Sequence, residues 1–170
     1  MPHLIIEYSS NLRNRMNIER FVQEVHDAAA KIEDLPMPGL RTRASERTCY
    51  RIADGHPDNT FVHVVLRIRA GREPESKRRI GDRLYAVLCD CLASVFDSSP
   101  IGLTFEIQEI DVEYRYLKGN LGDYVRRRVE EKASTESKAF AIFHCAAARV
   151  AAPGAGSATA TTSAPALRKP

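Results

Sequence analysis

FVHVVLRIRAGREPES, residues 61–76, contains the junction between elements that decides the fold. Alternate residues of its first half are apolar and share one face of a predicted strand: Val62, Val64, Leu66 and Ile68. The opposite face of that strand carries basic side chains, those of His63, Arg67 and Arg69. The segment AGRE then leads into a predicted helix with Pro74 in its first turn, where proline is favoured. The stretch therefore predicts a strand, an arginine-containing turn and a helix.

Downstream of this junction the apolar pattern changes to helical spacing and then returns to alternation. The predicted helix has the apolar stripe Ile80, Leu84, Val87, Leu88, Cys91 and Val95. The segment SSP, residues 98–100, ends the helix, and residues 101–110 alternate again as a strand. This half of the chain is therefore predicted to be a β–α–β unit.

The chain upstream shows the same order of elements. Residues 2–8 alternate as a strand, and Asn14 or Asn17 can cap the helix that follows. The apolar stripe of this helix is Ile18, Phe21, Val22, Val25, Ala29 and Ile32. The prolines of LPMPG, residues 35–39, end the helix, and residues 40–52 are predicted to be extended.

Two such units predict an α+β fold, a double βαβ with a four-stranded sheet. Right-handed crossovers place both helices on one face of that sheet. The other face mixes apolar and polar residues, and an exposed apolar patch of that size is a liability for a monomer. We therefore expect another subunit to cover it.

The composition indicates a globular protein. The chain has 170 residues, of which 44% are hydrophobic and 28% charged. It shows neither an apolar run of membrane-spanning length nor a secretory leader, so we expect a cytoplasmic protein without membrane contact. The four cysteines form no CxxC pair and the five histidines lack metal-ligand spacing, so no metal site is expected.

The C-terminal part of the chain differs in composition from the rest. From Ala133 onward it turns to Ala, Ser, Thr, Gly and Pro, which is typical of segments that do not fold on their own. We therefore expect one domain over residues 1–128 and a low-complexity, disordered tail over residues 129–170.

Arginines gather in three stretches, RTRASERTCYR, RIRAGREPESKRR and YVRRRVEEK, although the net charge is only +3. Such clusters bind phosphates, nucleic acid or small carboxylates. They also occur as solvated faces balanced by nearby Asp and Glu, which is the simpler interpretation for most of these residues.

The second residue, Pro2, carries the chemical hypothesis. A small second residue lets the initiator methionine be trimmed, which would leave Pro2 with a free secondary amine. An α-amino group titrates closer to neutrality than a lysine does. Burial and neighbouring cations lower its pKa further, which suits a general base working near neutral pH. Position alone does not distinguish such a base from an ordinary proline.

Four collinear segments between residues 2 and 128 resemble one known family: PHLIIEYS at the N-terminus, PGLRTR at 38–43, ADG…FVHVVLRIRAGREPES at 53–76 and LTFEIQEID at 103–111. They are similar to the 5-carboxymethyl-2-hydroxymuconate isomerases of the tautomerase superfamily, whose members use an N-terminal proline. The resemblance implies a double βαβ fold and a homotrimer with active sites near subunit boundaries. Residues 44–52 match poorly, and the tail has no counterpart.

The resemblance also implies a reaction and its residues. A small di- or tricarboxylate 2-hydroxy-dienoate becomes a 2-oxo-enoate without a cofactor, in aromatic-compound catabolism such as homoprotocatechuate degradation. Pro2 is expected to act as the base and then the acid. Arg41 and Arg72 match the functional arginines, and they are expected to bind carboxylates and stabilise the dienolate oxygen. Arg43 is expected to help shape the anion site.

Two alternative functions are compatible with the same sequence features. The same amine can promote another reaction of the superfamily, a decarboxylation or a hydration, because related folds host several chemistries. A non-catalytic binding protein with the same fold is the other alternative. A nucleic-acid partner is not expected.

Overall fold

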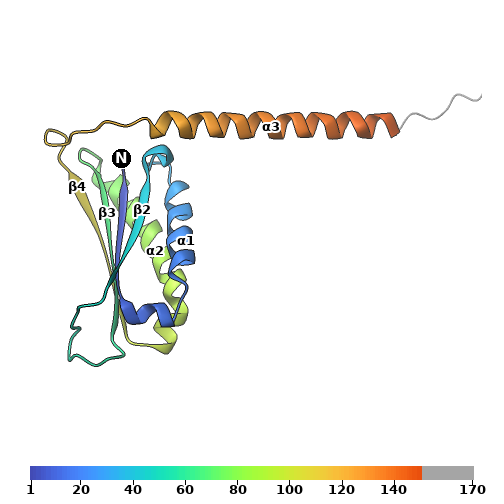
Figure 1. The fold of residues 1–170 in the computed structure, drawn as a ribbon. Helices are drawn as coiled ribbons and strands as arrows, with labels where there is room; N and C mark the ends of the chain where they lie inside the picture. The colour runs from blue at the N-terminus through green and yellow to red at the C-terminus, as the bar shows by residue number, and fades with distance from the viewer. Residues whose placement is uncertain (151–170) are drawn as a thin grey trace, which may run out of the picture. The chain divides into compact units, whose positions relative to one another are not determined.

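The structure is a computed structural model that describes the backbone of residues 1–150 and the side chains of residues 1–135. Along the chain the elements are β1 (His3–Ser9), η1 (Ser10–Asn14), α1 (Ile18–Ala30), η2 (Met37–Gly39), β2 (Arg41–Arg47), β3 (Thr60–Arg69), α2 (Pro74–Ser98), β4 (Ile101–Ile110) and α3 (Leu121–Val150) (Figure 1). The predicted order of strands and helices up to residue 110 is confirmed.

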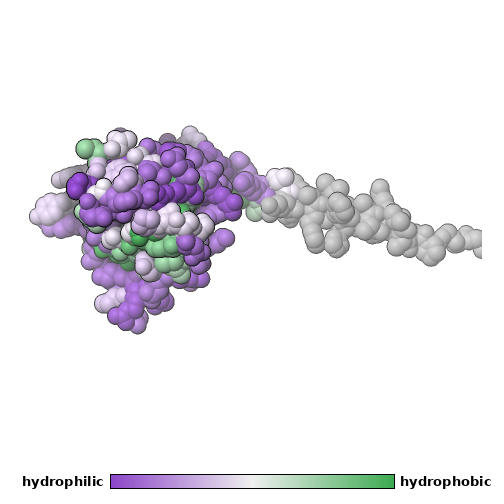
Figure 2. Space-filling model, turned by 90° about the horizontal axis from the view of Figure 1, so that it is seen from below, coloured by the Kyte–Doolittle hydropathy of each residue, from purple (hydrophilic) through white to green (hydrophobic). Residues whose placement is uncertain are grey.

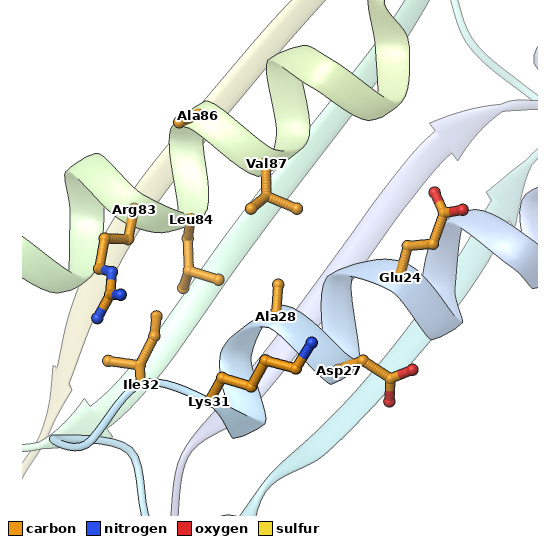
Figure 3. Close-up of a pocket in the computed structure, with 9 residues that line it drawn as sticks. All are labelled: Glu24, Asp27, Ala28, Lys31, Ile32, Arg83, Leu84, Ala86 and Val87. Atoms are coloured by element: carbon orange, nitrogen blue, oxygen red, sulfur yellow. The ribbon is translucent and has the colours of Figure 1, made fainter.

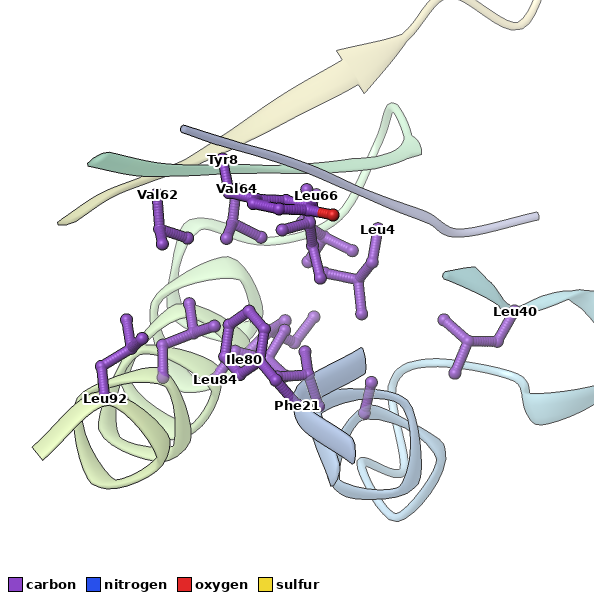
Figure 4. Packing of buried hydrophobic residues seen from close by; sticks show 14 of the residues in the cluster. Leu4, Tyr8, Phe21, Leu40, Val62, Val64, Leu66, Ile80, Leu84 and Leu92 are labelled. Carbon is purple, nitrogen blue, oxygen red and sulfur yellow. The ribbon is translucent and has the colours of Figure 1, made fainter. Parts of the chain in front are cut away.

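The four strands form one sheet in the order β2-β1-β3-β4. β1 and β2 are parallel, β3 and β4 are parallel, and the two pairs meet antiparallel along β1 and β3. Both α1 and α2 cover the same face of the sheet (Figures 1 and 4). The predicted double βαβ fold with two helices on one face is therefore confirmed.

The helix ends follow local sequence signals. Of the two capping candidates, Asn17 is the one used, because its side chain accepts a hydrogen bond from the Arg20 N–H at 2.8 Å. α2 begins at Pro74, as expected. The apolar stripe of α2 differs in part from the prediction, since Leu92 is fully buried while Val87 and Cys91 are only half-buried.

The core lies between the sheet and the two helices (Figure 4). Alternate residues of the central strands are almost fully buried in it: Leu4, Ile6, Tyr8, Val62, Val64, Leu66 and Ile68. The opposite face of the sheet is mixed, as predicted, with Ile5 and Val65 among the charged side chains of Glu7 and Arg67. The surface view in Figure 2 is mostly hydrophilic, with the hydrophobic residues gathered in one central band.

The chain after β4 departs from the sequence expectation. Residues 111–120 contain no helix or strand, and the first compact unit comprises Met1–Arg126. α3 runs to Val150, so the structure has helix over residues 129–150, where we expected disorder from the composition. Alanine is the strongest helix former, which a composition argument for disorder neglects. Residues 151–170 lie outside the described residues, and the boundary at residue 128 stays a prediction. Among the described helices, none is long and apolar enough to cross a membrane.

Candidate active site

One end of the sheet gathers the predicted functional residues. β1 and β2 begin at this end, and β3 and β4 finish there, because β3 is antiparallel to β1 (Figure 1). The start of the chain therefore lies beside Arg41, the first residue of β2, and Arg69, the last residue of β3. Arg72 follows in the turn before α2, and Arg115 follows in the segment after β4.

The N-terminus is enclosed in this cationic environment. Pro2 is buried, and its carbonyl accepts a hydrogen bond from the Arg41 N–H at 3.1 Å. Burial and the charges of four arginines lower the pKa of the Met1 amino group below its usual 8.0; in order of effect these are Arg115, Arg72, Arg41 and Arg69. An amine at this position is therefore biased toward its neutral, proton-accepting form.

Arg41 lies in direct contact with the N-terminus. Its Nη1 donates to the Gly39 carbonyl at 3.2 Å and to the Met1 Sδ at 3.1 Å. A Cβ at Gly39 would lie 3.2 Å from the Met1 Cγ, so the glycine of the PGLRTR motif allows the two segments to approach closely. The guanidinium is held by neutral acceptors, and its charge is not cancelled.

Arg72 is held in the same way. Its Nη1 donates to the Arg69 carbonyl at 3.0 Å and its Nη2 to the Asp34 carbonyl at 3.1 Å. The Asp34 carboxylate is itself bonded to α2, by the Ser76 Oγ at 2.9 Å and the Arg79 Nη2 at 3.2 Å. These hydrogen bonds fix the loop after α1 against the first turns of α2, and the loop carbonyl orients Arg72.

Two cavities adjoin Met1 and share Leu117 in their linings. The smaller, about 300 Å³, is lined by Arg41 and Lys118 among others. The larger, about 500 Å³, is lined by His3, Arg43, Arg67 and Arg115 among others. Arg72 lines neither cavity, although its charge acts on the N-terminal amine.

Arg43 belongs to the larger cavity and pairs with His3. The Arg43 Nη1 lies 3.3 Å from the His3 Nδ1, which accepts the hydrogen bond because a guanidinium only donates. Burial first, and then the charges of Arg43 and Arg41, lower the pKa of His3. His3 is therefore a neutral acceptor that fixes Arg43, the hydrogen-bonded structural role that such a histidine most often has.

The sequence pattern gives no role to Arg115 and places Arg69 only on the basic face of a strand. Both residues act on the N-terminal amine. A topological signal was available for Arg69, which pairs with Ile110 at the end of β4. No pattern in the sequence places Arg115, because it follows that strand in a segment without helix or strand.

The cavity between α1 and α2, about 560 Å³, has a different character (Figure 3). Its charged lining residues are of both signs: Glu24, Asp27, Lys31 and Arg83. It lies on the helical side of the sheet, away from the N-terminus. Within the described residues no cluster of His, Cys, Asp and Glu is arranged to hold a metal ion.

A double βαβ sheet with a buried, arginine-surrounded N-terminus defines a tautomerase-like isomerase fold. The family model described as 5-carboxymethyl-2-hydroxymuconate isomerase matches residues 2–125, and the chain belongs to this family. The predicted family and enzyme class, an isomerase, are thereby confirmed.

Similar proteins match over the same part of the chain. The chain is 31% identical over 121 residues to 5-carboxymethyl-2-hydroxymuconate Delta-isomerase of Escherichia coli, a match covering 71% of this chain and 96% of that protein. The crystal structure of a 5-carboxymethyl-2-hydroxymuconate isomerase from Deinococcus radiodurans R1 is 35% identical, with a TM-score of 0.67 and coverage of 73% and 93%. A crystal structure of 5-carboxymethyl-2-hydroxymuconate delta-isomerase is 28% identical, with a TM-score of 0.68 and coverage of 74% and 93%.

Proposed function

We propose that this protein converts 5-carboxymethyl-2-hydroxymuconate, or a similar 2-hydroxy-dienoate, to its 2-oxo-enoate isomer in the cytoplasmic catabolism of aromatic compounds. The observation that carries the proposal is the group of arginines around the N-terminal amine, which form no ion pair with the side chains that the structure describes. The names of the similar proteins from Escherichia coli and Deinococcus radiodurans support the substrate class.

The proposed base is the Pro2 nitrogen after removal of Met1. While Met1 is attached, this nitrogen is an amide and accepts no proton. Once freed, it takes the proton of the 2-hydroxyl group, and the substrate becomes a dienolate. The protonated proline then returns the proton to a carbon of the conjugated chain, which gives the 2-oxo-enoate with no net gain or loss of atoms.

The arginines have two proposed tasks. Arg41 and Arg72 bind carboxylates of the substrate and stabilise the negative charge that develops on the dienolate oxygen. Arg43, held by His3, adds positive charge to the wall of the site. The same charges keep the proline amine neutral, so one group of residues prepares the base and attracts its substrate.

The test is an ultraviolet assay of dienol consumption on protein whose first residue has been verified by intact mass. We expect the mass to lack Met1 and the Pro2→Ala variant to lose about 10²- to 10⁴-fold in kcat. The matched control is Pro57→Ala, in the exposed loop between β2 and β3, with activity within about twofold of wild type. Wild-type turnover by protein that retains Met1, or equal rates for wild type and Pro2→Ala, would contradict the proposal.

We also propose a homotrimer, which the family resemblance implies. Its support in this chain is the mixed sheet face opposite α1 and α2, where the apolar Ile5 and Phe61 are only half-buried among charged side chains. Light scattering should give three times the subunit mass of 19.0 kDa. A mass of one subunit would contradict it.

A further inference from the structure

The larger cavity beside the N-terminus has an unusual set of lining residues. Its described lining contains three arginines, Arg43, Arg67 and Arg115, together with His3 and no acidic residue. The rest of the lining consists of Met1, Ile110, Tyr114, Tyr116 and Leu117. A cavity of about 500 Å³ whose charged lining residues are all positive is suited to an anion.

These three guanidinium groups have no carboxylate partners among the described residues. Arg43 bonds to the neutral His3, and neither Arg67 nor Arg115 takes part in an ion pair there. Arginines in other regions are paired: Arg13, Arg15, Arg20, Arg47, Arg78, Arg79 and Arg126. Like charges that are grouped without a counter-ion repel one another, and a bound carboxylate would relieve this repulsion by charge-assisted hydrogen bonds.

The cavity is connected to the proposed reaction centre. Met1 lines it as well as the smaller cavity that contains Arg41, so the residue whose removal would free the Pro2 nitrogen borders both cavities. Arg115 is a second connection between the larger cavity and the N-terminal amine. It lines the larger cavity, and its charge also has the largest effect of the four arginines on the N-terminal amine.

The substrate class carries more carboxylates than the reaction centre accounts for. A muconate has a carboxylate at each end, and a carboxymethyl branch adds a third. We propose that Arg115, with Arg43 and Arg67, forms a separate subsite that binds this third carboxylate and selects tricarboxylates over dicarboxylates. The proposal rests on the proposed function for its substrate, but none of the three subsite residues donates or accepts the transferred proton.

Arg115→Gln tests the subsite by substrate discrimination. We expect kcat/KM for 5-carboxymethyl-2-hydroxymuconate to fall about 10- to 100-fold, mainly through KM, because one charge-assisted hydrogen bond is lost. For 2-hydroxymuconate, which lacks the branch, the change should stay within about twofold at a pH above the acidic limb of the rate profile, where the N-terminal amine is neutral in both proteins. Arg115→Lys should recover part of the loss. Arg13→Gln, at the other end of the sheet, should leave kcat/KM for both substrates unchanged. An equal loss for both substrates would overturn the proposal.

Binding of unreactive carboxylates separates the subsite from the reaction. In calorimetric titrations of the intact protein, Arg115→Gln should weaken tricarballylate about tenfold or more and leave glutarate unchanged. If wild type lacks isomerase activity but shows this pattern, the subsite stands and the proposed function fails. Equal binding of tricarballylate by both proteins would overturn the subsite. So would a change of oligomeric mass in Arg115→Gln, since the arginine would then serve the subunit interface.

Discussion

The two ends of the sheet both carry arginines, but among the described residues the arginines at one end form ion pairs with carboxylates, and those around the N-terminus at the other end do not. At the end where β1 and β2 finish, Arg13 pairs with Glu46 and Glu19, and Arg47 pairs with Glu7. At the end where the chain begins, the arginines around the N-terminus form no ion pair among the described residues: Arg41, Arg69, Arg72 and Arg115. The comparison separates arginines that are neutralised within the fold from arginines whose charge stays available to a ligand.

Backbone carbonyls are what make the second arrangement possible. They orient Arg41 and Arg72 by hydrogen bonds without adding a negative charge. The positive field at the N-terminus therefore persists, and it disfavours a protonated amine as much as it favours an anionic substrate. A carboxylate paired directly with one of these four arginines would weaken both effects at once.

Replacing one arginine at each end gives the largest expected contrast. Arg72→Ala should lower kcat about 10²- to 10³-fold, because a donor that stabilises the developing oxyanion is removed. Arg13→Ala should leave kcat/KM within about twofold of wild type. The measurement is steady-state kinetics of dienol consumption. An unchanged kcat/KM for Arg72→Ala would exclude Arg72 from the reaction.

The support of Arg72 should have a smaller effect than Arg72 itself. Asp34→Ala removes the hydrogen bonds to Ser76 and Arg79 that fix the loop whose carbonyl orients Arg72. We expect kcat to fall about tenfold with KM nearly unchanged, since the charge remains but its direction is less well defined. Asp34→Asn keeps an acceptor for Ser76 and should recover part of the rate. A loss of kcat with no recovery in Asp34→Asn would contradict a positioning role for that hydrogen bond.

The fold was predictable because its signals are local. Alternation in residues 61–69 and 101–110 and helical spacing between them determine which face of each element is buried, and the structure follows both. The sequence does not distinguish between Asn14 and Asn17 as the residue that caps α1, because the two are chemically equivalent. The structure shows that Asn17 is the cap. α3 extends past residue 128 to Val150, and the change of composition from Ala133 onward does not indicate this helix, since composition alone does not weigh the helix propensity of alanine.

The candidate site was predictable only in part. Pro2, Arg41 and Arg72 are site residues that the family resemblance predicts, and the strand order brings them to one end of the sheet. The bond from Arg72 to the Asp34 carbonyl joins two loops far apart in sequence, which no periodicity reveals. Arg115 lies outside any strand or helix, so its place near the N-terminus depends on the path of a single loop.

The pH dependence of kcat/KM should depend on the unpaired arginine charges, because these charges set the pKa of the N-terminal amine. The neutral amine is the active form, so kcat/KM should rise with pH through the pKa of the freed Pro2 amine. Burial and the arginines lower the pKa of the Met1 amine at this end of the chain, and we expect them to lower that of Pro2 in the same direction. Arg69→Gln removes one of these charges, raises that pKa and moves the acidic limb of the profile to higher pH. Arg13→Gln should leave the limb in place. A limb that moves to lower pH in Arg69→Gln would contradict the electrostatic account.

The smallest expected difference is in stability. Removing a paired cation with Arg13→Gln leaves Glu46 and Glu19 without their partner, so the Tm at low salt should fall slightly. Removing an unpaired cation with Arg115→Gln relieves repulsion among the arginines near the N-terminus. The Tm should therefore stay the same or rise by at most about a few degrees. Salt screens both effects, and the two variants should converge on wild type at about 1 M salt. If Arg115→Gln instead loses stability at low salt, its charge has a partner within the folded protein, and the contrast between the two ends of the sheet does not hold for that residue.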